Sequence, residues 1–134
     1  MTTLAVLDAH TLIWTAADAR RLLGRRARAF IDRVEAGRAS AYVPTIALVE
    51  IGEAVRSGKV TFVDGFERWT DRLASSGRYH IVDLTLSIVQ RAHELYDIPE
   101  RGDRLVAATA VELDCPVITK DPRIAQAPGV DAIW

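Results

Sequence analysis

Four acidic residues stand out because each adjoins an apolar stretch of the sequence. They are Asp8, Glu50, Asp103 and Asp121. Carboxylates that converge on one point repel each other unless cations join them. Oxygen ligands with no cysteine and no histidine pair favour Mg²⁺ or Mn²⁺ over zinc. One or two such ions can activate a water and stabilise an in-line attack on a phosphate.

The apolar pattern predicts elements that bring three of these acids to one edge of a sheet. Leu4–Leu7 is a short apolar run, typical of a buried central strand, and Asp8 ends it. The nearly continuous apolar run Leu105–Leu113 predicts a buried helix that follows Asp103, with a polar loop before it. A short strand, Val117–Thr119, precedes Asp121. In a right-handed strand–helix–strand unit, the start of a helix and the end of the following strand share an edge, where open parallel sheets bind ligands.

Glu50 belongs to a predicted helix, Ile46–Arg56, which Thr45 would cap. At about 100° per residue, the buried stripe of this helix includes Ala47 and Ala54, and Glu50 lies at the edge of that stripe. A carboxylate half inside an apolar face needs a cation, a metal or a proton. The helix begins just after a predicted strand, which keeps Glu50 near the same edge as the other acids.

The remaining elements alternate between strand and helix. The further strands expected are Ser40–Val43, Tyr79–Leu84 and Val130–Trp134. The further helices expected are Ala9–Thr15, a long amphipathic helix through Ala27 and Val34, Asp64–Ser75 and Thr85–Tyr96, with one turn after Pro122. This alternation predicts a single α/β domain over residues 1–134, with a mainly parallel sheet of four or five strands between two helical layers.

Several candidate residues have a purely structural alternative. Asp8 and Asp103 are also good helix caps, and Asp121 before Pro122 is a good turn residue. Thr119 either holds a water or an acid in place or is an ordinary β-branched strand residue. His10 follows Asp8 closely and favours a partly buried, hydrogen-bonded histidine. The three tryptophans, Trp14, Trp69 and Trp134, favour core or interface anchors over base-stacking platforms.

Composition limits the class of protein. Hydrophobic content of 49% and charged content of 26% are ordinary for a soluble protein, and no apolar run is long enough for a membrane span. A cytoplasmic location is expected, with the lone Cys115 in the core. The net charge of −1 excludes a globally basic domain, although five arginines gather between Arg20 and Arg28. They predict either a basic patch or a solvated helix face.

Four motifs in order resemble the PIN domain of the VapC toxin family. They are LDAHTLIW at the start, IALVEI around Glu50, GDRLVAATA around Asp103 and VITKD ending at Asp121. Their spacing and the total length agree with that family over essentially the whole chain. Its three core acids are matched by position by Asp8, Glu50 and Asp103. Asp121 matches the more variable fourth acid of the family, and Thr119 matches the hydroxyl residue near that acid. At the position of Ala9, members of the family often have a hydroxyl residue. Alanine cannot make the water contact that such a hydroxyl would make.

The resemblance implies a small Mg²⁺- or Mn²⁺-dependent ribonuclease that cleaves RNA, forms homodimers and is neutralised by a VapB-like antitoxin. Arg25, Arg26 and Arg104 are the predicted RNA phosphate contacts. The alternative is a PIN-like module that binds RNA or a protein without cleavage. A dehalogenase-like phosphatase fits less well, because it would need an aspartate where His10 stands, and a response-regulator receiver lacks its acid pair before Asp8.

Overall fold

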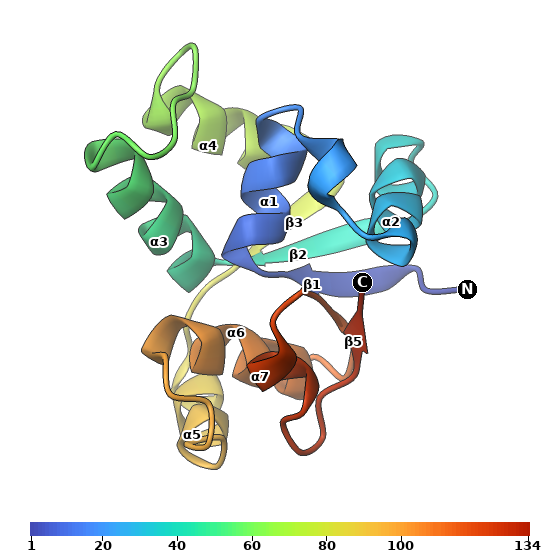
Figure 1. Ribbon diagram of the computed structural model, residues 1–134, viewed down its shortest axis with the longest axis vertical. Helices are drawn as coiled ribbons and strands as arrows, with labels where there is room; N and C mark the ends of the chain where they lie inside the picture. The colour runs from blue at the N-terminus through green and yellow to red at the C-terminus, as the bar shows by residue number, and fades with distance from the viewer.

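The centre of the structure is a five-stranded sheet. The computed structural model describes all of residues 1–134. Its strands are β1 (Leu4–Leu7), β2 (Ser40–Pro44), β3 (Tyr79–Val82), β4 (Val117–Ile118) and β5 (Ala132–Ile133). Every pairing is parallel, and the order across the sheet is β3-β2-β1-β4-β5 (Figure 1). The predicted α/β class with a parallel sheet is confirmed.

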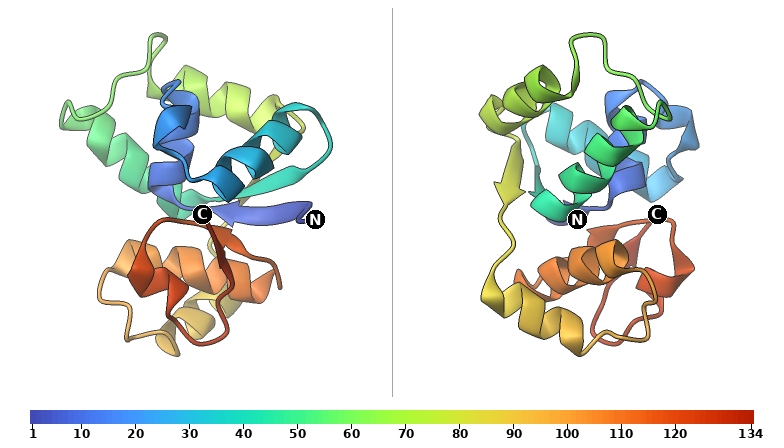
Figure 2. Two further views of the ribbon diagram at one scale, coloured as in Figure 1. Left: turned by 45° about the vertical axis from the view of Figure 1, so that its right-hand side comes forward. Right: turned by 90° about the vertical axis from the view of Figure 1, so that its left-hand side faces the viewer.

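Helices cover both faces of the sheet, which gives the expected three layers (Figures 1 and 2). One layer contains α1 (Ala9–Ala16), α2 (Arg25–Glu35), α3 (Thr45–Arg56) and α4 (Phe66–Ser75), with a short 3-10 helix, η1 (Arg20–Leu22), between α1 and α2. The other layer contains α5 (Leu86–His93), α6 (Arg101–Glu112) and α7 (Pro122–Ala125). None of these helices is both long and apolar enough to span a membrane.

The central strand β1 is where the chain changes direction across the sheet. It pairs with β2 on one side and β4 on the other, and Ala5, Val6 and Leu7 are completely buried. The chain first builds β2 and β3 outward on one side and then returns to add β4 and β5 on the opposite side. Crevices form at the carboxyl end of the strands where the order reverses in this way. Asp8 follows β1 at that point.

The apolar stretch before β4 forms α6, which is covered from two directions. It packs against β1 on one side and α5 on the other, so Leu105 through Ala110 are all buried. A helix between a sheet and a second helix has little exposed face, which explains its nearly unbroken apolar sequence. The same packing fixes the start of α6 above the end of the sheet.

Several element boundaries differ from the predictions. Residues 98–102 were expected to be a loop, but α6 already begins at Arg101, with Glu100 rather than Asp103 in the N-cap position. Thr45 is the first residue of α3 and makes no side-chain cap. The strand predicted to reach Leu84 ends at Val82, because its partner β2 ends at Pro44, opposite Val82.

The last predicted strand and its neighbour are also shorter. The sequence favoured a strand over Val130–Trp134, but β5 contains only Ala132 and Ile133. These two residues pair with the two residues of β4, which is the only strand beside β5. A strand at the edge of a sheet extends only as far as its single partner.

Candidate active site

Four carboxylates from four different elements line one cavity at the carboxyl edge of the sheet. They are Asp8 after β1, Glu50 on α3, Asp103 in the first turn of α6 and Asp121 after β4. The cavity has a volume of about 420 Å³, and its other lining residues are Ala9, His10, Trp14, Lys120 and Pro122. The structure therefore brings together all four acids that the sequence singled out.

Asp8 is the most rigidly held of the four acids. Its side chain is only 7% exposed, and Oδ1 accepts a hydrogen bond of 2.8 Å from the backbone N–H of Thr11. Its other oxygen, Oδ2, accepts a hydrogen bond from the Thr119 hydroxyl. Asp8 is thus a helix cap and also part of the acidic cavity. The two roles are compatible, because each carboxylate oxygen still has a lone pair free for another partner.

Thr119 connects two of the acids. It is almost completely buried, and besides donating to Asp8 its Oγ1 accepts a hydrogen bond of 3.0 Å from the backbone N–H of Asp121. Asp121 in turn begins α7, where its Oδ1 accepts from the Arg123 N–H at 2.9 Å. One hydroxyl therefore sets the position of the Asp8 carboxylate and of the backbone that carries Asp121.

Glu50 and Asp103 experience the negative charge of the site most strongly. Burial, followed by the charges of Asp103 and Asp8, raises the pKa of Glu50 to about 7. Burial, followed by the charge of Asp121 and a hydrogen bond with it, raises the pKa of Asp103 to about 6. Carboxyl groups this close lower their repulsion by taking up a proton or by sharing a cation. The site is therefore short of positive charge.

Gly102 allows two of the elements to approach each other. A β-carbon at this position would lie 2.7 Å from Cδ of Glu50 and closer still to its Oε1. Any larger residue would therefore push the carboxylate away from the start of α6. The small residue before Asp103 keeps Glu50 and Asp103 in the same cavity.

The set of donors fits a hard divalent cation. All four acidic ligands offer oxygen, the one cysteine lies elsewhere, and His10 is the only histidine in the cavity. No three of these side chains are gathered closely enough to surround one ion as they stand. The four carboxylates are the residues that would hold a divalent cation here, through their oxygens. Mg²⁺ and Mn²⁺ prefer such oxygen ligands.

The predicted basic residues lie outside the cavity. Arg25 and Arg26 are exposed at the start of α2, and neither makes an ion pair. Arg104 donates to the carbonyl oxygen of Pro99 at 3.2 Å and does not line the cavity. The cation that does line it is Lys120, which sequence reasoning did not single out. Lys120 directly precedes Asp121 and follows the predicted strand, and this position could have indicated that it lies at the cavity.

His10 differs from its expected state. It is exposed and makes no hydrogen bond, and together with Trp14 it forms an aromatic part of the cavity wall. The sequence placed it near the site but favoured a partly buried, hydrogen-bonded side chain. The capping of α1 by Asp8 explains the difference, because it turns the second helical residue toward the open edge of the sheet.

The fold and the cavity define an α/β protein with an acidic site at the switch point of a parallel sheet. A family model described as PIN domain matches residues 5–130, so the chain belongs to the PIN-domain family. None of the curated proteins matches the sequence. The resemblance inferred from the four motifs is confirmed at the level of the family.

Three solved structures of other proteins share the fold. A chain of VapBC2 from Rickettsia felis, bound to a DNA fragment of its promoter, has a TM-score of 0.72 at 15% identity, with 97% of both chains covered. A toxin–antitoxin complex from Klebsiella pneumoniae gives 0.64 at 20% identity, covering 97% of this chain and 96% of that one. FitAcB from Neisseria gonorrhoeae gives 0.66 at 18% identity, with the same coverage.

Proposed function

We propose that this protein is a VapC-like toxin: an endoribonuclease that depends on Mg²⁺ or Mn²⁺ and acts in the cytoplasm through one domain, residues 1–134. The observation that carries the proposal is the convergence of Asp8, Glu50, Asp103 and Asp121 in one cavity at the switch point of the sheet. Membership of the PIN-domain family and a fold shared with toxin–antitoxin complexes support it.

The four carboxylates are the residues that would hold the metal. A bound divalent ion would supply an activated water and neutralise charge on the attacked phosphate. Asp8, fixed through both oxygens, presents its free lone pairs in a constant direction. Glu50, with a pKa of about 7, carries a proton part of the time near neutral pH, and it would have to lose that proton to hold a metal.

The experiment is cleavage of a defined, structured RNA by purified protein, with Mg²⁺ or Mn²⁺ and with EDTA. A variant with Asp8→Asn, purified identically, is the control, because asparagine still caps α1 but removes a charged ligand. We expect cleavage that requires the metal and falls by at least about 100-fold in the variant. Cleavage that persists in EDTA or in the variant would contradict the proposal. RNA binding without any cleavage would favour the non-catalytic module instead.

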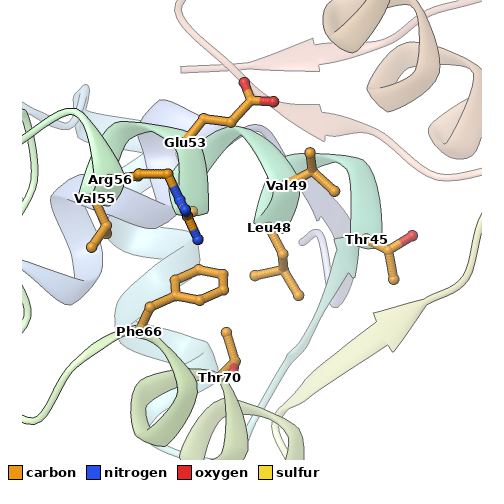
Figure 3. Close-up of a pocket in the computed structure, with 9 residues that line it drawn as sticks. Thr45, Leu48, Val49, Glu53, Val55, Arg56, Phe66 and Thr70 are labelled. Atoms are coloured by element: carbon orange, nitrogen blue, oxygen red, sulfur yellow. The ribbon is translucent and has the colours of Figure 1, made fainter.

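The partner in this proposal is a VapB-like antitoxin, and a second cavity offers it a surface. A groove of about 710 Å³ lies between α3 and α4 (Figure 3). At about 100° per residue, its α3 residues Leu48 and Val55 lie roughly opposite Glu50 around the helix. Leu48, Val55 and Phe66 make it apolar, and Thr70 lies on its α4 side. An amphipathic helix places one apolar face into a groove of this kind. A chain seated there needs only to cross α3 to cover the acidic cavity.

A further inference from the structure

One wall of the acidic cavity is aromatic. His10 and Trp14 lie one turn apart on α1, and both line the cavity with the four acids. Their ring centroids are 5.7 Å apart, with the planes tilted by 47°. The row continues to Trp134, whose ring centroid lies 5.8 Å from that of Trp14 at a tilt of 60°. Three rings therefore lead away from the carboxylates.

Packing explains only one end of this row. Trp134 is half-buried and covered by the segment before α2, since a β-carbon on Gly24 would lie 2.6 Å from its Cδ1. Trp14 is half-buried between Trp134 and the cavity, whereas His10 is exposed. A purely structural role accounts for the contact between the two indoles. It does not account for an imidazole and an indole that line the same cavity as four carboxylates.

Free positive charge lies at both ends of the aromatic row. At the cavity end, Lys120 is exposed and lines the same space as His10. At the far end, Gly24 leads directly into Arg25 and Arg26, which are exposed and make no ion pair. Aromatic faces between cations are the usual surface for single-stranded nucleic acid, whose bases stack while its phosphates meet the cations.

We infer that His10 and Trp14 form a stacking site for unpaired bases next to the phosphate that is cleaved, with Trp134 holding the Trp14 ring in place. This inference rests on the proposed ribonuclease function and assigns the residues of this chain that would contact unpaired bases. Bases inside a duplex present only their edges, so they cannot lie on these rings. The start of α2 then contacts phosphates further along the strand.

The inference is tested by measuring binding of a labelled single-stranded RNA of twelve uridines. The same strand in a duplex is measured for comparison. All proteins carry Asp8→Asn, so that the RNA is not cut. We expect Trp14→Leu to weaken binding of the single strand by about 5- to 50-fold, and Trp14→Phe, which keeps a ring, by less than about threefold. Trp69→Phe is the matched control, because Trp69 stacks on Phe62 outside the cavity.

Fluorescence gives a second measurement that a merely structural role would not change. With Trp69→Phe and Trp134→Phe, Trp14 is the only tryptophan left. Stacking predicts that saturating RNA quenches its emission. Unchanged emission, or a folded Trp14→Leu protein that binds RNA as tightly as its parent, would overturn the inference. If Trp14→Leu does not fold, His10→Ala at the exposed position replaces it, with an expected loss of about 3- to 10-fold.

The inference and the proposed function fail in different ways. Quenching by RNA with no metal-dependent cleavage by the unmodified protein would support the stacking site and reject the nuclease. Cleavage that requires the metal, together with unchanged binding by Trp14→Leu, would support the nuclease and reject the stacking site. Equal binding of the single strand and the duplex would also reject it.

Discussion

At the scale of single residues, Thr119 has the most consequences for the site. Its hydroxyl donates to Asp8 and accepts from the backbone N–H of Asp121, so it joins the ends of the neighbouring strands β1 and β4. A side chain that orients ligands in this way has effects comparable to those of the ligands themselves. The sequence left it open whether Thr119 positions an acid or only fills a strand. In the structure it contacts both aspartates.

Replacement of this hydroxyl should lower both activity and stability. Thr119→Val keeps the shape but leaves a buried carboxylate oxygen and a backbone N–H without their partner, at a cost of about 1–3 kcal/mol. We expect metal-dependent cleavage to fall by about 10- to 100-fold. Thr119→Ser restores the hydroxyl and should remain within about threefold of the unmodified protein. Cleavage rates and thermal unfolding measure the two effects. Equal activity of the valine and serine variants would show that the hydroxyl does not matter.

The meeting of the four acids in one cavity could be predicted from sequence, but their side-chain states could not. Asp8 and Asp121 follow apolar strands, and Glu50 disturbs an amphipathic pattern, so local signals were enough to find them. The exposure of His10 and the involvement of Lys120 depend on which way short connections turn. Those directions depend on how the start of α1 and the end of β4 are placed against the rest of the cavity, which is a tertiary feature.

At the scale of elements, the meeting of α3 and α6 determines whether Glu50 and Asp103 share a cavity. α6 begins at Arg101, two residues before Asp103, because Glu100 has the extended backbone of an N-cap residue. The sequence predicted the helix and its acid but placed its start too late. The reason is that 98–102 is polar and carries Pro99 and Gly102, which together resemble a loop. Here the glycine instead permits close contact between two helices.

The variant Gly102→Ala should change the stability of the protein and the activity of the site in different ways. Alanine is a better helix former, by up to about 1 kcal/mol, and the atom it would meet belongs to the flexible end of Glu50. We therefore expect thermal unfolding at the same or a slightly higher temperature, while metal-dependent cleavage falls by about tenfold or more because Glu50 is displaced. A large loss of stability would mean that the helices themselves had moved apart. Unchanged cleavage would show that the contact is not needed.

At the scale of the whole molecule, two apolar surfaces are left uncovered. One is the groove between α3 and α4, proposed above for the antitoxin. The other lies on the start of α5, where Leu86 is 73% exposed and Val89 is 45% exposed, on the side away from the buried Ile88. Exposed apolar side chains that lie side by side can belong to an interaction surface. We propose that the homodimer implied by the resemblance to the VapC family has its contact there.

Charge introduced on this face of α5 should separate the two copies. We expect the unmodified protein to give the mass of a dimer in light scattering, and Leu86→Glu combined with Val89→Glu to give that of a monomer. Because both side chains are exposed, the temperature of unfolding of the monomer should change little. Thr70→Arg, on the groove side of α4, is the matched control and should stay dimeric. A dimeric double variant would place the contact elsewhere.

The order of the strands has a consequence for how such a protein is made. The hydroxyl of Thr119 and the carboxylate of Asp8 are 111 residues apart in the chain, yet they meet at the centre of the sheet. During translation, β1, β2 and β3 emerge well before β4, so one edge of β1 stays open until β4 has left the ribosome. The acidic cavity therefore stays incomplete until Thr119 and Asp121 have joined Asp8. A protein able to cut RNA would thus have no complete site while its first three strands are already made.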